Sequence, residues 1–127
     1  MRVVVNMENA RSFEPAEPGP YPLVIKAMGN PEKKEKSTII EVEFQFEDPE
    51  MDRACGTITR MYPIDGKGAG FFRDFWKAAT GQELPVGQAG IAIDTDDAIG
   101  RHVIGDVANR EYQGKLYNEV KSVVAAQ

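Results

Sequence analysis

The chain has 127 residues, of which 42% are hydrophobic and 28% charged, a balance typical of a single folded domain. Its apolar runs are far shorter than the ~20 residues that cross a bilayer, and nothing in it matches a secretory signal, so we expect a cytoplasmic protein without membrane contact. Cys55 and His102 are the only cysteine and histidine, which excludes an internal disulfide and a zinc site built from these residue types. We therefore expect neither a metal nor a cofactor.

The formal net charge is -5, but the acidic residues are segregated along the chain. Residues 37–52 contain six acidic residues and residues 82–100 contain four, and neither stretch contains a lysine or an arginine. The rest of the chain is consequently net basic. A local positive surface is compatible with this distribution, so the net charge does not exclude a nucleic-acid ligand.

Residues 1–20 are rich in proline near their end and show no regular apolar spacing, which predicts an extended arm leading into a folded domain over residues 21–127. Residues 21–28 alternate apolar and polar side chains and predict a first strand. Residues 37–47 alternate most regularly and predict a second strand with one buried and one solvated face. Its apolar face would carry Ile40, Val42, Phe44 and Phe46, and its polar face Glu41, Glu43, Gln45 and Glu47.

A third strand is predicted over residues 56–63, followed by a glycine-rich turn at 65–70. The apolar period then changes to that of a helix over residues 71–80, with Gly81 at its C-terminal end. Two valine-rich runs, 101–109 and 116–124, predict the last strands, joined by a loop at 110–115. The helical stripe comprises Phe71, Phe72, Phe75, Trp76 and Ala79, and we expect Phe75 and Trp76 to include a buried core anchor.

The predicted order is three strands, one helix and two strands. This is the order of the OB fold, a five-stranded Greek-key barrel with a helix between its third and fourth strands. We therefore predict a mainly β protein with an OB-fold domain behind the N-terminal arm.

Short segments along the chain carry a family likeness. They are Gly19-Pro20-Tyr21 before the first strand, Lys36-Ser37 at the start of the second, Phe75–Gly81 at the end of the helix, and Ile99-Gly100-Arg101 leading through Tyr112 to Asn118-Glu119-Val120. In these features the chain resembles phage- and prophage-encoded OB-fold single-stranded-DNA-binding proteins. The resemblance implies a DNA-binding protein, not an enzyme, that coats single strands with little sequence preference in phage-type DNA replication or recombination. It is compatible with a replication or recombination protein as partner and with a homo-oligomer in the host cytoplasm.

In OB folds the binding groove crosses the second and third strands and is flanked by the loop between the first two strands and the loop between the last two. These loops are expected at residues 29–36 and 110–115. Single-strand binding needs cations for phosphates and exposed rings for base stacking. The predicted nucleic-acid-binding residues are Lys26, Lys33, Lys34, Lys36, Arg60, Tyr62, Arg110, Tyr112, Lys115 and Tyr117.

Several interpretations of these residues stay open. The lysines at 33–36 alternate with glutamates and are also compatible with a solvated hairpin tip, and Tyr62 or Tyr117 is compatible with a core position. The glutamates at 41, 43 and 47 would repel phosphate, so we expect their face to be turned away from the groove. The alternative function is an OB-like protein-interaction module, such as an accessory subunit, whose acidic strand contacts a basic partner.

Two further motifs are interpreted as structural. Gly66, Gly68 and Gly70 fit neither a P-loop nor a dinucleotide-binding spacing, so a plain turn is favoured over a phosphate contact. The segment 94–97 resembles the start of a calcium loop, but Ala98 and Ile99 stand where a ligand and a glycine are required. Asp94 or Thr95 is therefore expected to cap a short turn.

Overall fold

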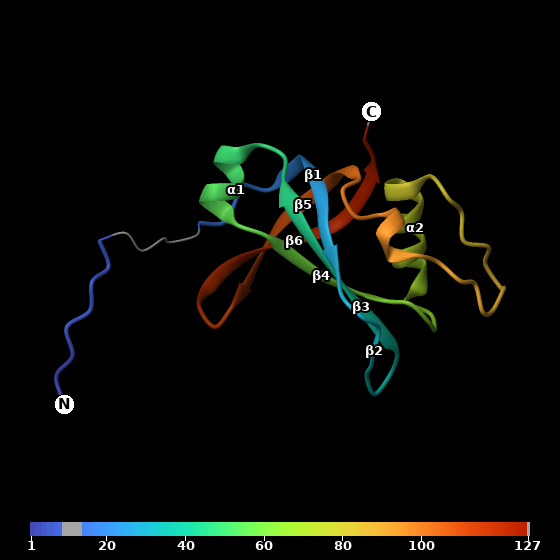
Figure 1. The fold of residues 1–127 in the computed structure, drawn as a ribbon, viewed down its shortest axis with the longest axis horizontal. Coiled ribbons are helices and arrows are strands. Elements are labelled where there is room, and N and C mark those ends of the chain that lie inside the picture. The colour runs from blue at the N-terminus through green and yellow to red at the C-terminus, as the bar shows by residue number, and fades with distance from the viewer. Residues whose placement is uncertain (9–13, 127) are drawn as a thin grey trace.

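The computed structural model describes residues 1–8 and 14–126 and is mainly β, as the sequence predicts. Its strands form one antiparallel sheet, accompanied by two α-helices and a 3₁₀ turn (Figure 1). The elements in chain order are β1 (Gly19–Met28), β2 (Glu32–Lys33), β3 (Thr38–Phe46), α1 (Pro49–Cys55), β4 (Ile58–Pro63), α2 (Ala69–Thr80), η1 (Thr95–Asp97), β5 (His102–Tyr112) and β6 (Lys115–Ala125).

The sheet has the order β2-β3-β1-β5-β6, and β4 pairs with β3. β1 is therefore central, between β3 and β5, while β4 and β6 stand at opposite ends of the path β4-β3-β1-β5-β6. The register of β3 against β4 pairs Ile40 with Tyr62 and Phe44 with Ile58. Since side chains opposite each other lie on the same face of a sheet, this register brings the apolar sides of the two strands together.

The alternation of β3 is confirmed. Ile40, Val42, Phe44 and Phe46 are all buried, and they pack with Leu23 and Ile25 of β1 and Val103 and Val107 of β5. Gly105 of β5 is required for this packing, because a Cβ at that position would overlap the Leu23 side chain. The period of two has thus assigned the inner face of the sheet correctly.

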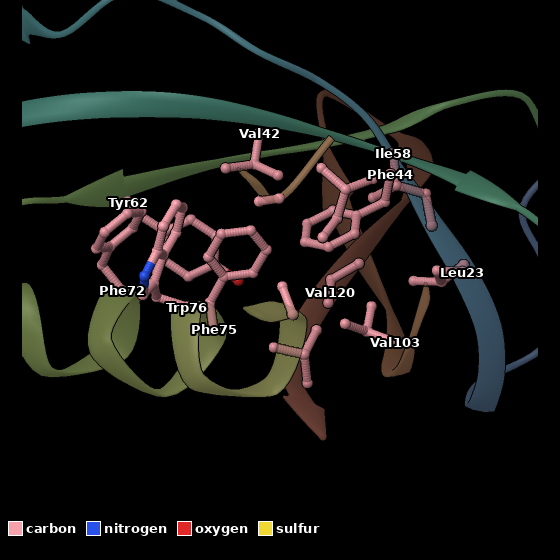
Figure 2. Packing of buried hydrophobic residues seen from close by; sticks show 14 of the residues in the cluster. Leu23, Val42, Phe44, Ile58, Tyr62, Phe72, Phe75, Trp76, Val103 and Val120 are labelled. Carbon is pink, nitrogen blue, oxygen red and sulfur yellow. The ribbon is translucent and has the colours of Figure 1, made fainter. Parts of the chain in front are cut away.

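Helix α2 supplies the aromatic half of the core. Phe72, Phe75 and Trp76 are buried beside Tyr62, and Phe75 packs edge-on against Phe44 at a centroid distance of 5.8 Å (Figure 2). The helix contacts β4 and β6 and ends at Gly81, which adopts the left-handed conformation expected of it. Phe71, in contrast, is 60% exposed, so its assignment to the buried stripe was wrong.

The packed part of the chain begins upstream of the predicted boundary at residue 21. Ala16 is buried, the Glu14 amide donates to the Ala54 carbonyl, and the Ala16 amide donates to the Asn118 side chain at 2.7 Å. The first part of the arm, residues 1–8, is exposed and extends away from the sheet (Figure 1). The remaining part of the predicted arm, residues 9–13, lies outside the described residues.

Helix α1 and strand β2 were not predicted, although α1 has recognisable start signals. Asp48 caps the helix by accepting a hydrogen bond from the Glu50 amide, and Pro49 occupies the first helical position.

The capping role of Asp94 is confirmed, since its carboxylate accepts from the Asp96 amide. None of the helices found among the described residues is long and apolar enough to span a membrane.

The core role of α2 can be tested with two phenylalanines of the same helix. Phe75→Ala should lower the free energy of unfolding by about 3–5 kcal/mol, because it removes a ring that is completely buried. Phe71→Ala is the matched control and should change it by less than about 1 kcal/mol, since that ring is mostly exposed. Urea denaturation monitored by circular dichroism measures both; equal losses would contradict the assigned orientation of α2.

Candidate functional site

A groove of about 830 Å³ lies between β4 and β6 and extends to the end of the β5–β6 hairpin. The hairpin projects from the body of the molecule (Figure 1). The groove is lined by cationic, aromatic, polar and apolar residues and one acid from three strands, namely Thr59, Arg60, Met61, Arg110, Tyr112, Tyr117, Asn118, Glu119, Val120 and Lys121. Several of the predicted site residues line it.

Arg60 forms the link between the two sides of the groove. Its Nη1 donates to the carbonyl oxygens of Val120 and Lys121, both at 2.7 Å. The guanidinium also lies 4.4 Å from the centroid of the Tyr62 ring, within the range of a cation–π interaction. Arg60 therefore ties β4 to β6 and places a fixed positive charge at the base of the groove.

The β5–β6 hairpin presents the exposed rings. Gln113 and Gly114 have φ values of 51° and 78°, the positive values that a two-residue hairpin turn requires. The tight turn makes Arg110 face Tyr117, and Tyr112 face Lys115, across the ladder. The predicted six-residue loop at 110–115 was therefore wrong, because all but two of its residues belong to strands. Tyr112 and Tyr117 are 57% and 50% exposed, and this exposure rules out the core alternative for Tyr117.

The structure brings together four of the ten predicted site residues. Arg60, Arg110, Tyr112 and Tyr117 line the groove, and Lys115 lies next to it as the partner of Tyr112. The lysines at 26, 33, 34 and 36 are exposed but do not line the groove, and Lys34 forms an ion pair of 2.9 Å with Glu32. The first connection, residues 29–36, thus contributes no lining residue.

Tyr62 must be removed from the predicted set. It is 1% exposed and its ring stacks on Phe75 at 5.0 Å, so no base could reach it. Its hydroxyl is buried and finds no hydrogen-bond partner among the described residues. Burial raises the pKa of Tyr62 to about 12 and outweighs the opposite effect of the nearby Arg60 charge.

The acidic face of β3 lies closer to the groove than expected. Glu41 is paired with Met61 and Glu43 with Thr59, and both of these β4 residues line the groove. Residues that face each other across a ladder have Cβ atoms ~5 Å apart, so the two carboxylates border the groove. Neither of them lines the groove itself, so the expectation that this row is turned away from a bound strand stays a prediction, and Glu47 lies elsewhere and pairs with His102 at 3.0 Å.

Sequence reasoning missed Thr59, Met61, Asn118, Glu119, Val120 and Lys121 as lining residues. A usable signal existed for Thr59 and Met61: once Ile58 is assigned to the core, alternation places them on the outer face. No comparable signal existed for Lys121. The β5–β6 ladder has a bulge at Asp106/Val107, where Ser122 and Val120 face consecutive residues and Lys121 is left out of the pairing.

No three His, Cys, Asp or Glu side chains within residues 1–8 and 14–126 converge as metal ligands. Burial, reinforced by the charge of Glu14, raises the pKa of the Cys55 thiol, which keeps it in its weakly nucleophilic protonated form at neutral pH. Gly66 and Gly68 lie in the turn before α2, whereas Gly70 belongs to the helix, which starts two residues earlier than predicted and has no side-chain cap.

Neither a scan against protein-family models nor a search of curated proteins found a match to the chain.

The buried Tyr62 predicts a specific loss of stability in alkali. Its pKa is about 12 in the folded protein and near its ordinary value of 10.0 when unfolded, so below pH 10 the hydroxyl is neutral in both states. Between pH 10 and 12 only the unfolded chain loses this proton, and stability should fall by about 2–3 kcal/mol. Urea titrations at pH 8 to 12 measure this fall.

Tyr62→Phe is the control for the other groups that titrate in the same range. It should show a smaller fall between pH 10 and 12, and at neutral pH it should be as stable as the wild type or more so, because the buried hydroxyl it removes has no partner among the described residues. Identical pH profiles would contradict the burial of the hydroxyl.

Proposed function

We propose that the chain is an OB-type barrel that binds single-stranded DNA in the groove between β4 and β6. Three observations support the fold assignment: the path β4-β3-β1-β5-β6, the position of α2 between β4 and β5 in the chain, and the Arg60 side chain that joins β4 to β6 at the two ends of this path. In OB folds single strands bind over the second and third main strands beside the loop between the last two. Here these are β3, β4 and the β5–β6 turn.

The observation that carries the proposal is the pairing of exposed rings with cations along one groove. Tyr112 and Tyr117 are each at least half exposed, and Arg110 and Lys121 line the same groove. A tyrosine ring stacks on any base, with a contribution of about 1–3 kcal/mol per base, while cations follow the phosphates. This combination suits a single strand, whose bases are accessible, better than a duplex, whose bases are stacked on each other.

The biological setting follows the resemblance described above. We propose stoichiometric coating of single strands during phage-type replication or recombination, without a cofactor. Stacking and phosphate contacts are both tolerant of sequence, which accounts for a binder with broad substrate range.

A second candidate function is supported by an exposed apolar side chain in the groove. Met61 is 54% exposed, and Glu41 and Glu43 face Met61 and Thr59 across the β3–β4 ladder. A mixed apolar and acidic surface is suited to a basic segment of another protein. This is the accessory-subunit alternative, and the experiment below separates it from DNA binding.

Titration of a fluorescent oligo-dT at several salt concentrations tests the proposal. Oligo-dT should bind more tightly than a duplex of the same length, and Tyr112→Ala should weaken binding by about 1–3 kcal/mol at every salt concentration. Arg110→Ala and Lys121→Ala should instead lower the slope of log affinity against log salt, by about 0.7 for each phosphate that the variant no longer binds.

Lys33→Ala serves as the matched control, since it removes one exposed cation that does not line the groove. It should leave the slope nearly unchanged. Equal affinity for single strand and duplex, or no binding of oligo-dT at low salt, would reject the proposal and leave the accessory-subunit function.

A further inference from the structure

The carboxylates of Glu41 and Glu43 have no assigned role in stacking or phosphate binding. Both side chains are partly buried on the outer face of β3, and neither takes part in any ion pair or side-chain hydrogen bond found among the described residues. Glu47 and Glu83 do have partners, in His102 and Lys77, whereas Glu119, on the β6 side of the groove, has none among the described residues either. Two acceptor groups beside the groove are therefore available to a ligand.

The charges of the groove are arranged asymmetrically. Arg110 and Lys121 line it from the β5–β6 side together with one acid, Glu119, so that this side is net positive. Glu41 and Glu43 border it from the β3 side, next to Met61 and Thr59. A single strand in this groove is attracted by its phosphates to the first side and repelled from the second. Its backbone should consequently follow β6 and the hairpin, so that its bases point toward β4 and the two carboxylates.

A carboxylate presents two oxygen acceptors and no donor, so it selects bases by their donors. The Watson–Crick edge of guanine has two adjacent donors, N1–H and the N2 amino group, which match the two oxygens of one carboxylate. In cytosine and adenine a single amino donor stands next to a ring acceptor, and in thymine the N3–H donor stands between two carbonyl oxygens. Those neighbouring acceptors are repelled by the second carboxylate oxygen, which leaves guanine as the best partner.

We infer that Glu41 and Glu43 give the groove a preference for guanine within single-stranded DNA. The inference rests on the proposed single-strand binding and adds to it a contact with base edges, which unpaired strands leave accessible. Thr59 and Met61 separate the two glutamates from the hairpin side of the groove, so the base would lie over β4 while its phosphates stay near Arg110 and Lys121.

Competition titrations with three oligonucleotides of equal length test this preference. Alternating dT-dG should bind at least about fivefold more tightly than oligo-dT, the lower bound for one bidentate contact to a base. Alternating dT-dI, in which hypoxanthine lacks the N2 amino group but keeps the same ring, should lose most of this gain. Alternating sequences are used because they avoid runs of guanine.

The double substitution Glu41→Gln with Glu43→Gln should remove most of the difference between dT-dG and oligo-dT, because each glutamine places an amide donor where an acceptor is needed. Oligo-dT itself should bind equally or more tightly, since two repulsive charges are removed. The matched control is Glu8→Gln with Glu35→Gln, which changes the net charge equally at two exposed positions that do not line the groove. This control should keep the wild-type ratio of the affinity for dT-dG to the affinity for oligo-dT.

The outcomes separate the inference from the proposed function. If the wild type binds oligo-dT and dT-dG equally, or if both double variants change the ratio to the same extent, the guanine preference is overturned while single-strand binding stands. If no oligonucleotide binds at low salt, both the proposed function and the preference are rejected. The inference is supported if the ratio of the affinity for dT-dG to the affinity for oligo-dT falls only in the Glu41 and Glu43 double variant.

Discussion

The groove depends on one side chain that connects strands which no ladder connects. β4 pairs with β3 and β6 pairs with β5, and the Arg60 guanidinium joins β4 to β6 by donating to two consecutive carbonyls of β6, while α2 packs against both strands. Charged donors form stronger hydrogen bonds than neutral ones, and two bonds from one nitrogen to adjacent peptide units define the relative position of the strands. Because Tyr62 lies beneath the guanidinium, the same residue couples the groove to the aromatic core under α2.

The features of the fold that were predictable are those with a long and regular period. The alternation from Ile40 to Phe46 identified the buried face of β3, and the spacing of Phe72, Phe75 and Trp76 identified α2. The failures concern short elements. α1 has seven residues and none of them is buried, so it has no apolar stripe that could indicate a helix, although Asp48 and Pro49 marked its start. β2 has two residues, too few for any periodicity.

At the candidate site, the position of the last connection and its residue types were informative together. Arg110, Tyr112 and Tyr117 were predicted because they lie in or beside the connection between the last two strands, which flanks the groove in OB folds, and they do line one groove. The face on which a residue lies was harder to predict. The inner side of β4 carries Ile58, Arg60 and Tyr62. The arginine nevertheless reaches the groove between β4 and β6, while the tyrosine is enclosed by α2. Their different exposure comes from contacts between segments far apart in the sequence, which no local pattern contains.

The hydrogen bonds between Ala16 and Asn118 hold part of the N-terminal arm against β6. Asn118 lines the groove, receives the Ala16 amide on its oxygen, and donates from its nitrogen to both the Ala16 carbonyl and the Asn109 side chain. A shortened chain that begins at Tyr21 would lose these bonds together with a buried core residue, and the base of the hairpin would lose its anchor.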